Sequence, residues 1–196
     1  GEQRSTEGTG LVVDRVGGAG SESDPGVPAT EFRFGSVNGV AVDPEGRVYV
    51  SDAVGHRIWR IERDGTIHAH AGTGTAGDSG DGGPALDAQL NRPGPLAVGP
   101  DGSVYFTSAE NDRVRRIRPD GLIGTVAGNG REGHDGIGGP AIDASLVNPG
   151  AIAVNADGIV FFVDGATRTR LNAVSTDGRL RHLNADARAR ATDDGT

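Results

Sequence analysis

Residues 39–46, GVAVDPEG, decide the fold, because they recur as PLAVGPDG at 95–102 and as AIAVNADG at 151–158. The two displacements, 95 − 39 and 151 − 95, are both 56 residues. Each copy joins an apolar run to a turn, and in the first copy Pro44 presets φ at the second turn position. An internal period of this size is typical of repeat architectures.

The segments that follow keep the same offset. The next run reads RVYVSD at 47–52, SVYFTS at 103–108 and IVFFVD at 159–164. Two further runs are contained in HRIWRIERDGTIHAHAG at 56–72 and DRVRRIRPDGLIGTVAG at 112–128, with a weaker copy at 169–184. Short apolar runs separated by glycine turns predict four antiparallel strands per repeat. A single such sheet leaves both faces wet, so the sheets must stack around an axis.

A long glycine-rich connection also repeats, as AGTGTAGDSGDGGPALDAQLNRP at 71–93 and AGNGREGHDGIGGPAIDASLVNP at 127–149. Together with the GVAVDPxG, VYVxD and DGxI motifs, it resembles the NHL-repeat family of β-propellers, in its bacterial form with GxGGPA connections. The resemblance covers residues 10–183. The predicted fold is all-β, a β-propeller of four-stranded antiparallel blades, with about three complete blades plus one partial blade.

This pattern divides the chain into an NHL-type arc over 1–183 and a C-terminal tail over 184–196. The predicted units of the arc are a partial blade at 1–33, which supplies a last strand and a return loop, and blades at 34–93, 94–149 and 150–183. Three blades form an open arc with unpaired sheet edges, and such edges invite pairing with another chain. A homodimer that closes a six-bladed ring is therefore a predicted assembly.

Missing residue types exclude several chemistries. All nineteen basic residues are Arg, and the chain has no Lys or Cys. Without Lys there is no Walker-type phosphate loop, and without Cys there is no thiolate nucleophile or thiolate zinc site. The formal net charge of −8 disfavours nucleic acid as a partner. No apolar run is long enough to predict membrane insertion.

No catalytic residue is predicted. The GTGTAG segment at 72–77 matches a dinucleotide-binding pattern, but no helix long enough for a parallel crossover follows it. His68 and His70 stand two apart on a predicted outer strand, hence on one face, where paired imidazoles can bind a metal. Asp78 and Asp81 offer oxygens to calcium without the usual loop spacing. We therefore expect no cofactor, with a calcium or zinc ion as the alternative.

The turn between the second and third strands of a blade lies at the same end as the connection to the next blade. Loops on a rigid scaffold are where recognition usually resides. We therefore expect this end to bind a partner. The candidate partner-binding residues are His56, Arg57, Asp78, Asp81, Arg92, Glu110, Asp112, Arg113, Arg131, His134 and Arg168. A basic stripe on one third strand, made of Arg113, Arg115, Arg116 and Arg118, is interpreted as solvated charge.

The resemblance implies a non-catalytic recognition or sensor module that binds a protein or a glycan, with an extracellular or bacterial cell-surface location favoured. The alternative is part of a six-bladed metal-dependent hydrolase or lyase of the lactonase type. Such enzymes need acidic, amide or imidazole side chains that converge at the channel mouth. Here the innermost strands end in Asp43, Gly99 and Asn155, which are interpreted as hairpin residues. RNA binding is disfavoured by the acidity of the chain.

Overall fold

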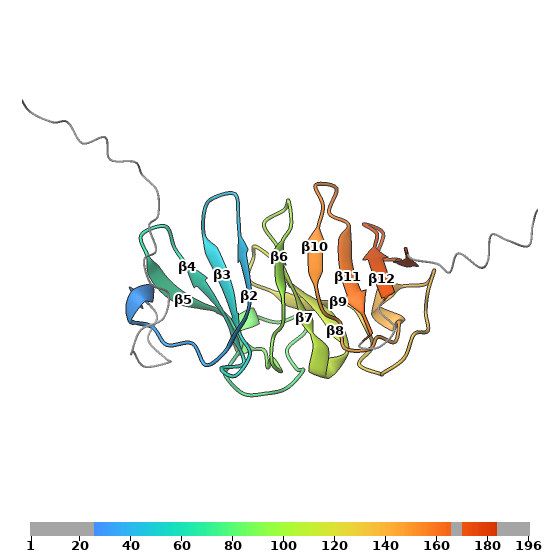
Figure 1. The fold of residues 1–196 in the computed structure, drawn as a ribbon, viewed down its shortest axis with the longest axis horizontal. Coiled ribbons are helices and arrows are strands. Elements are labelled where there is room, and N and C mark those ends of the chain that lie inside the picture. The colour runs from blue at the N-terminus through green and yellow to red at the C-terminus, as the bar shows by residue number, and fades with distance from the viewer. Residues whose placement is uncertain (1–25, 166–169, 184–196) are drawn as a thin grey trace, which may run out of the picture.

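The computed structural model describes residues 26–165 and 170–183, and in these ranges the regular elements are β-strands and short 3-10 helices (Figure 1). The strands form three antiparallel sheets that stand side by side. We call these sheets blades 1, 2 and 3 in chain order. Within the described residues, no helix has the length and apolar character needed to cross a membrane.

Each blade contains four strands that pair in chain order. Blade 1 consists of β2 (Val37–Val42), β3 (Val48–Asp52), β4 (Arg57–Ile61) and β5 (Thr66–Ala71). Blade 2 consists of β6 (Leu96–Val98), β7 (Val104–Ser108), β8 (Arg113–Ile117) and β9 (Ile123–Ala127). Blade 3 consists of β10 (Ile152–Val154), β11 (Val160–Asp164), β12 (Arg170–Val174) and β13 (Leu180–His182). The predicted all-β fold of four-stranded antiparallel sheets is confirmed.

The hairpin between the first two strands of each blade closes as the DPEG-type turns predict. In blade 1 the Gly46 N–H donates to the Asp43 carbonyl at 3.0 Å, and Gly46 has a φ of 82°, which favours glycine. The same bond recurs from Gly102 to Gly99 and from Gly158 to Asn155. The interpretation of the strand-end residues as hairpin residues is therefore confirmed.

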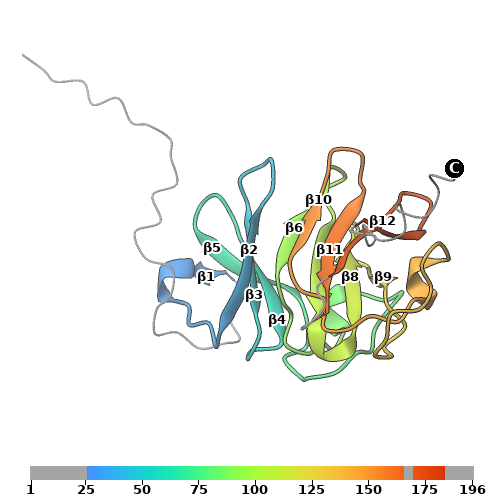
Figure 2. The same ribbon diagram turned by 45° about the vertical axis from the view of Figure 1, so that its right-hand side comes forward.

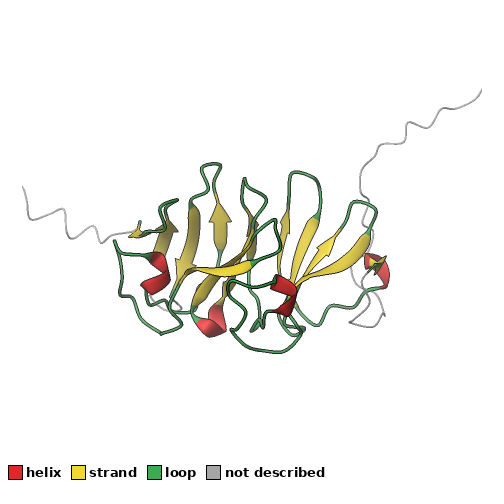
Figure 3. Cartoon of the chain, turned by 180° about the vertical axis from the view of Figure 1, so that it is seen from behind, coloured by secondary structure: helices red, strands yellow, loops and turns green. Residues whose placement is uncertain are grey.

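Each glycine-rich connection also clasps the outer strand of the blade that follows it. In the connection from blade 1 to blade 2, the Gly82 N–H donates to the Ile123 carbonyl at 2.8 Å, and the Ile123 N–H donates to the Gly83 carbonyl at 3.0 Å. In the first blade the clasp is long enough to form a strand, β1 (Val27–Pro28), beside β5. Four 3-10 helices accompany these segments and turns (Figure 3): η1 (Ala29–Glu31), η2 (Ala85–Asp87), η3 (Ala109–Asn111) and η4 (Ala141–Asp143).

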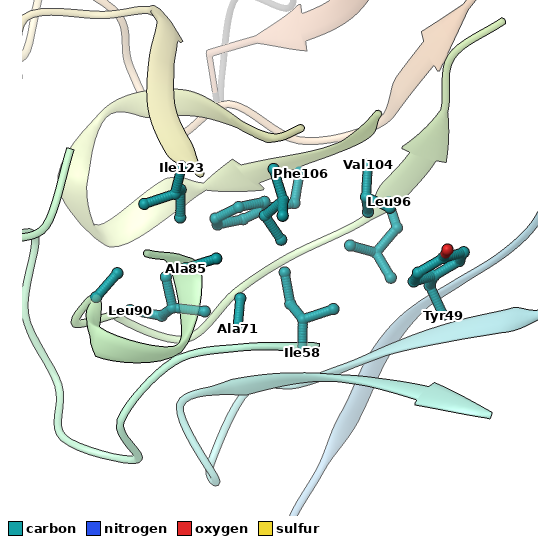
Figure 4. Packing of buried hydrophobic residues seen from close by; sticks show 11 residues of the cluster. Tyr49, Ile58, Ala71, Ala85, Leu90, Leu96, Val104, Phe106 and Ile123 are labelled. Atoms are coloured by element: carbon teal, nitrogen blue, oxygen red, sulfur yellow. The ribbon is translucent and has the colours of Figure 1, made fainter. Parts of the chain in front are cut away.

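Two of the three buried clusters lie between blades, and the third packs the segment before β2, including Phe32, against Trp59 and Ile67 of blade 1. Tyr49 and Ile58 of blade 1 pack with Leu96, Val104 and Phe106 of blade 2 in one buried cluster (Figure 4). Burial of a side chain such as Phe106 stabilises the fold by roughly 1.5–3 kcal/mol. The second cluster, between blades 2 and 3, contains Tyr105, Val114, Ala127, Leu146, Val160, Phe162, Val174 and Leu180.

Several predicted parts fall outside the described residues. These are residues 1–25 of the predicted partial blade, the tail at 184–196 and Arg168. The predicted blade boundaries at 93/94 and 149/150 fall in the loops that precede β6 and β10.

Candidate functional site

The long connections lie at one end of all three blades, together with the turns between second and third strands (Figure 2). We call this the loop end, made of connections 72–95 and 128–151 and of turns 53–56 and 109–112. The short turns between first and second strands and between third and fourth strands lie at the opposite end, which we call the hairpin end. The candidate partner-binding residues that the structure describes lie at the loop end or on strands next to it.

Arg113 ties two connections to blade 2. Its Nε lies 2.7 Å from Asp78 Oδ2, an ion pair in which the N–H is not aligned for a good hydrogen bond. Its Nη atoms donate to the carbonyls of Gly128 and Asn129, each at 3.3 Å. Asp78 also accepts a 3.3 Å hydrogen bond from Asn111. These candidates therefore hold loops in place in addition to reaching the surface.

The interpretation of the basic stripe as solvated charge is wrong for Arg115, whose side chain is fully buried. Its guanidinium donates to Asp81 at 2.6 Å and to the carbonyls of Gln89 and Ser79 at 3.0 and 3.2 Å. Asp81 also accepts the backbone N–H and the hydroxyl of Thr125, at 3.0 and 2.6 Å. Arg115 is buried because the connection from blade 1 to blade 2 covers this face of β8.

Burial by itself would raise the pKa of Asp81, but the hydrogen bonds from Thr125 and Arg115 outweigh it and hold that pKa below its usual range. The carboxylate is therefore charged at neutral pH and fastens the connection to both β8 and β9. The sequence carried one signal of the role of Arg115, because the matching positions of blades 1 and 3 hold Trp59 and Asn172 in place of an arginine. The structure buries both of these side chains as well.

Two pairs of neighbouring turns are locked by side chains that bond to backbone. His56 Nδ1 accepts the Arg92 N–H at 3.3 Å, and one repeat later Asp112 Oδ1 accepts the Asn148 N–H at 2.9 Å. All four residues have φ between 48° and 52°, the left-handed region that non-glycine residues seldom adopt. Conformations of this kind persist only where the surroundings hold them. Four turns of the loop end are therefore fixed in shape.

The remaining candidates differ in how firmly they are bound. The Arg57 Nη2 donates to the Thr73 carbonyl at 2.8 Å, and its guanidinium lies 5.6 Å from the centre of the Trp59 ring. Arg92 and Glu110 approach to 3.7 Å with side chains 60% and 53% exposed, and such surface pairs contribute little to stability. Arg131 is exposed in connection 128–151.

His134 and Asp164 form a contact between connection 128–151 and blade 3. His134 Nδ1 lies 3.4 Å from Asp164 Oδ2. Burial raises the pKa of Asp164, although the N–H of Val147 and the imidazole of His134 act against the rise. One repeat earlier the acid stands in the connection, as Asp78, and the basic partner stands on the blade. At the junction with blade 3, the connection supplies the imidazole and blade 3 supplies the carboxylate.

The predicted metal candidates both lie on the face of blade 1 that meets blade 2. Arg60 pairs in register with both Tyr49 and His68, and the His70 ring lies 4.9 Å from the Tyr49 ring. A register shift in the β4–β5 pairing places His70 in a bulge. In residues 26–165 and 170–183, no three His, Cys, Asp or Glu side chains are grouped so that they could hold a metal ion.

Comparisons of sequence place these features beside known proteins. The profile of the NHL repeat family matches residues 34–61. Teneurin-m of Drosophila melanogaster is 30% identical over 170 residues, which cover 79% of this chain and 6% of teneurin-m. Teneurin-1 of Homo sapiens is 33% identical over 95 residues, which cover 42% of this chain and 4% of that protein. The chain thus spans a small part of these relatives. Both are animal proteins, which gives no support to the bacterial form expected from the connections.

Comparisons of structure identify related folds at low sequence identity. A nidogen/laminin complex matches with a TM-score of 0.55 and 20% identity, over 77% of this chain and 49% of that chain. A gluconolactonase of Xanthomonas campestris matches with a TM-score of 0.55 and 18% identity, over 76% and 47%. A virginiamycin B lyase of Staphylococcus aureus matches with a TM-score of 0.52 and 20% identity, over 77% and 43%. The chain spans about half of each solved chain, and these matches show a common fold.

Proposed function

Since this chain belongs to the NHL-repeat family of β-propellers, we propose that it is a non-catalytic recognition module that binds a protein or glycan partner through its loop end. The observation that carries the proposal is the fixed shape of the loops. Arg57, Arg113 and Arg115 bond loop carbonyls, and two pairs of left-handed turns are locked across neighbouring segments. A surface that is ordered before binding loses less conformational entropy when a partner docks.

The exposed side chains at this end are suited to recognition. Arg92, Glu110, Arg131 and Asp135 are exposed, and Ile137 is an exposed apolar residue at 50%. Arginine is enriched in protein interfaces, and a mixed-charge rim around an apolar residue is typical of them. The more deeply bonded candidates, above all Asp81 and Arg113, would act by holding these side chains in position.

The structural relatives support more than one use of this fold. One structural match is a chain of a nidogen/laminin complex, and its membership of a complex agrees with a binding role. The gluconolactonase and the lyase share the fold equally well, so a lactonase-like hydrolase or lyase remains the alternative. Lactone hydrolysis by the purified chain that rises when calcium or zinc is added would favour that alternative.

The loop-end proposal is tested by matched charge reversals. We expect Arg92→Glu with Arg131→Glu to weaken capture of a partner at least tenfold. The two new carboxylates would repel a partner surface that the exposed guanidinium groups now attract. Arg63→Glu at the hairpin end is the control, since Arg63 is exposed but lies away from the loops. Photocrosslinkers at positions 131 and 63 then identify what each end touches. Equal capture by the double variant and the control would overturn the proposal.

We further propose that two copies pair through blade 3. Leu171 and Leu183 are 40% and 47% exposed on this blade. Leu171 corresponds to Ile58 in blade 1 and to Val114 in blade 2, and both of these are fully buried under the next blade. An apolar face of this kind is suited to cover by a further blade, and a second copy of this chain can supply one.

A further inference from the structure

The cleft between blades 1 and 2 at the hairpin end carries charged groups that the loop end does not use. It has a volume of about 290 Å³, close to the lower limit for small-ligand sites. The charged and aromatic side chains that line it are Glu45, Arg47, Tyr49, Arg60, His70, Asp101 and Arg118. Three guanidinium groups and one imidazole thus open onto the same space.

Two of the arginines are oriented by carboxylates and retain free donors. The Arg60 Nε donates to Glu62 at 2.6 Å, and the Arg47 Nε donates to Asp43 at 2.5 Å. A guanidinium carries five N–H groups. The remaining N–H groups of Arg60 have no acceptor among the described residues. The carboxylates therefore fix the direction of each fork and leave donors for a ligand.

His70 lies between these charges with its ring nitrogens unbonded. Its ring lies 4.9 Å from the Tyr49 ring, and within the described residues neither nitrogen has a hydrogen-bond partner. Burial, followed by the positive charges of Arg60 and Arg47, lowers the pKa of His70 to about 4. The two guanidinium charges thus add to burial in disfavouring the protonated imidazole, and a bound anion would offset their part of the shift.

The equivalent cleft between blades 2 and 3 lacks this set. Its positions that match Arg47, His70 and Arg118 are held by Ser103, Val126 and Ser175. That cleft, of about 630 Å³, is lined by Asp101, Asp157 and Asp177 with one arginine, Arg116. Since the two clefts share their architecture and the tyrosine, the fold itself does not require the basic set. Departures from a repeat of this kind mark functional positions.

We propose that the cleft between blades 1 and 2 binds the phosphate or sulfate group of a small molecule. Arg60 and Arg47 would pair with the oxyanion through their planar forks, which match tetrahedral oxyanions well, and His70 would donate one hydrogen bond. At ~30 Å³ per water, the cleft has the volume of roughly ten water molecules, more than one tetrahedral anion fills. The cleft volume that the anion leaves unfilled would hold the rest of the ligand.

The other charged groups around His70 are accounted for on both blades. On blade 1, Glu45 lies 3.3 Å from Arg47, and His68 is the nearest titratable neighbour on the same strand. On blade 2, Arg118 pairs with Asp120 at 2.9 Å. The carboxylate of Asp101 accepts the hydroxyl and N–H of Ser103, at 2.8 and 3.1 Å. Glu45 is thus paired with the guanidinium of Arg47, whereas Asp101 is bonded to a neutral serine and keeps its negative charge.

The test is a titration of the full chain with sulfate and, separately, with inorganic phosphate, monitored by NMR at the His70 ring. Chloride at equal ionic strength is the control. We expect saturable shifts with at least one oxyanion and a rise in the pKa of His70. Sulfate keeps its charge across the pH range, so it gives the pH profile. By linkage, sulfate binding should tighten as the pH falls through the His70 pKa of the complex.

Variants separate this site from general attraction to arginine. Arg60→Gln should weaken binding at least tenfold, whereas Arg116→Gln, the matched change in the other cleft, should leave it unchanged. His70→Val installs the residue that blade 2 uses at this position and should remove the pH dependence of sulfate binding while the fold is kept. Unmoved His70 resonances with both oxyanions, or equal shifts in Arg60→Gln, would overturn the proposal. Neither result bears on the loop end.

Discussion

One repeated position on the third strand of each blade takes three different side chains. Trp59, Arg115 and Asn172 occupy it in blades 1, 2 and 3, and each is at least 97% buried. Trp59 packs against Phe32 with ring centres 4.4 Å apart, whereas Asn172 bonds to the His182 ring at 3.0 Å. Trp59 and Arg115 thus contact segments that cover their blades, whereas Asn172 bonds to the neighbouring strand of its own blade. The side chain at this position therefore varies with its partner.

We expect Arg115→Leu to destabilise the protein by about 2–4 kcal/mol, because it leaves the carbonyls of Ser79 and Gln89 without donors and removes the partner of Asp81. The loss stays below that of a fully buried pair, since Asp81 is 40% exposed and remains solvated. Urea unfolding of the variant measures it. Arg118→Gln, an exposed change on the same blade, is the control, and equal midpoints for the two variants would contradict the assignment.

The pH dependence of stability should depend in part on Asp43. Burial would raise the pKa of Asp43, but hydrogen bonds from Arg47 and Tyr49 outweigh burial, so its folded pKa lies below 3.8. A lowered carboxyl pKa adds stability that is present above the unfolded pKa and is lost as the pH falls through the folded pKa. Asp43→Asn should therefore cost about 2 kcal/mol at pH 7 and much less in strong acid. Denaturant unfolding at both pH values checks this, and an equal cost would count against the ion pair.

The connection is the element that distinguishes these blades from plain four-stranded sheets. After β5 and β9 the chain turns at Gly72 and Gly128, which have φ of 98° and 94°. Each of these N–H groups then donates to the first alanine of the following 3-10 helix, Ala85 or Ala141, at 2.9 Å. The backbone thus turns immediately at the end of the outer strand and passes to the next blade.

A pair of glycine substitutions tests this turn. At Gly128 an added Cβ would lie 2.1 Å from the carbonyl oxygen of Asp112, and φ is positive. Gly128→Ala should therefore cost at least about 2 kcal/mol. Gly124→Ala, four residues earlier on β9, meets nothing within 4 Å and should be neutral or slightly stabilising. Thermal melts of both variants measure the difference, and similar melting temperatures would show that the turn tolerates a side chain.

At the scale of the whole molecule, stability arises between blades. The two clusters that join neighbouring blades contain most of the large buried side chains, including Phe106 and Phe162. Blade 3 presents an exposed apolar face of the same type, with Leu171 and Leu183. A face that is buried in blades 1 and 2 and exposed in blade 3 is the basis for the proposed pairing of copies.

The expected mass in solution is therefore that of a dimer, twice 20.0 kDa. Light scattering after size exclusion measures it. Leu171→Glu should shift the mass to that of the monomer, because the new carboxylate would lose its hydration in the interface. Leu86→Glu, an exposed change in η2, is the control and should leave the dimer intact. A monomer for the unmodified chain would contradict pairing through blade 3.

The sequence by itself determined the repeat, the four strands of each blade, the hairpin turns and the end at which the loops gather. These features depend on local spacing, because alternation and turn residues act over a few positions. Only the tertiary structure decided which charges are free. Arg115 and Asp81 are 34 residues apart, and stacking of blades brings them together. The same stacking collects Arg47, Arg60 and His70 with Arg118 in one cleft, since burial and pairing depend on which distant segments meet.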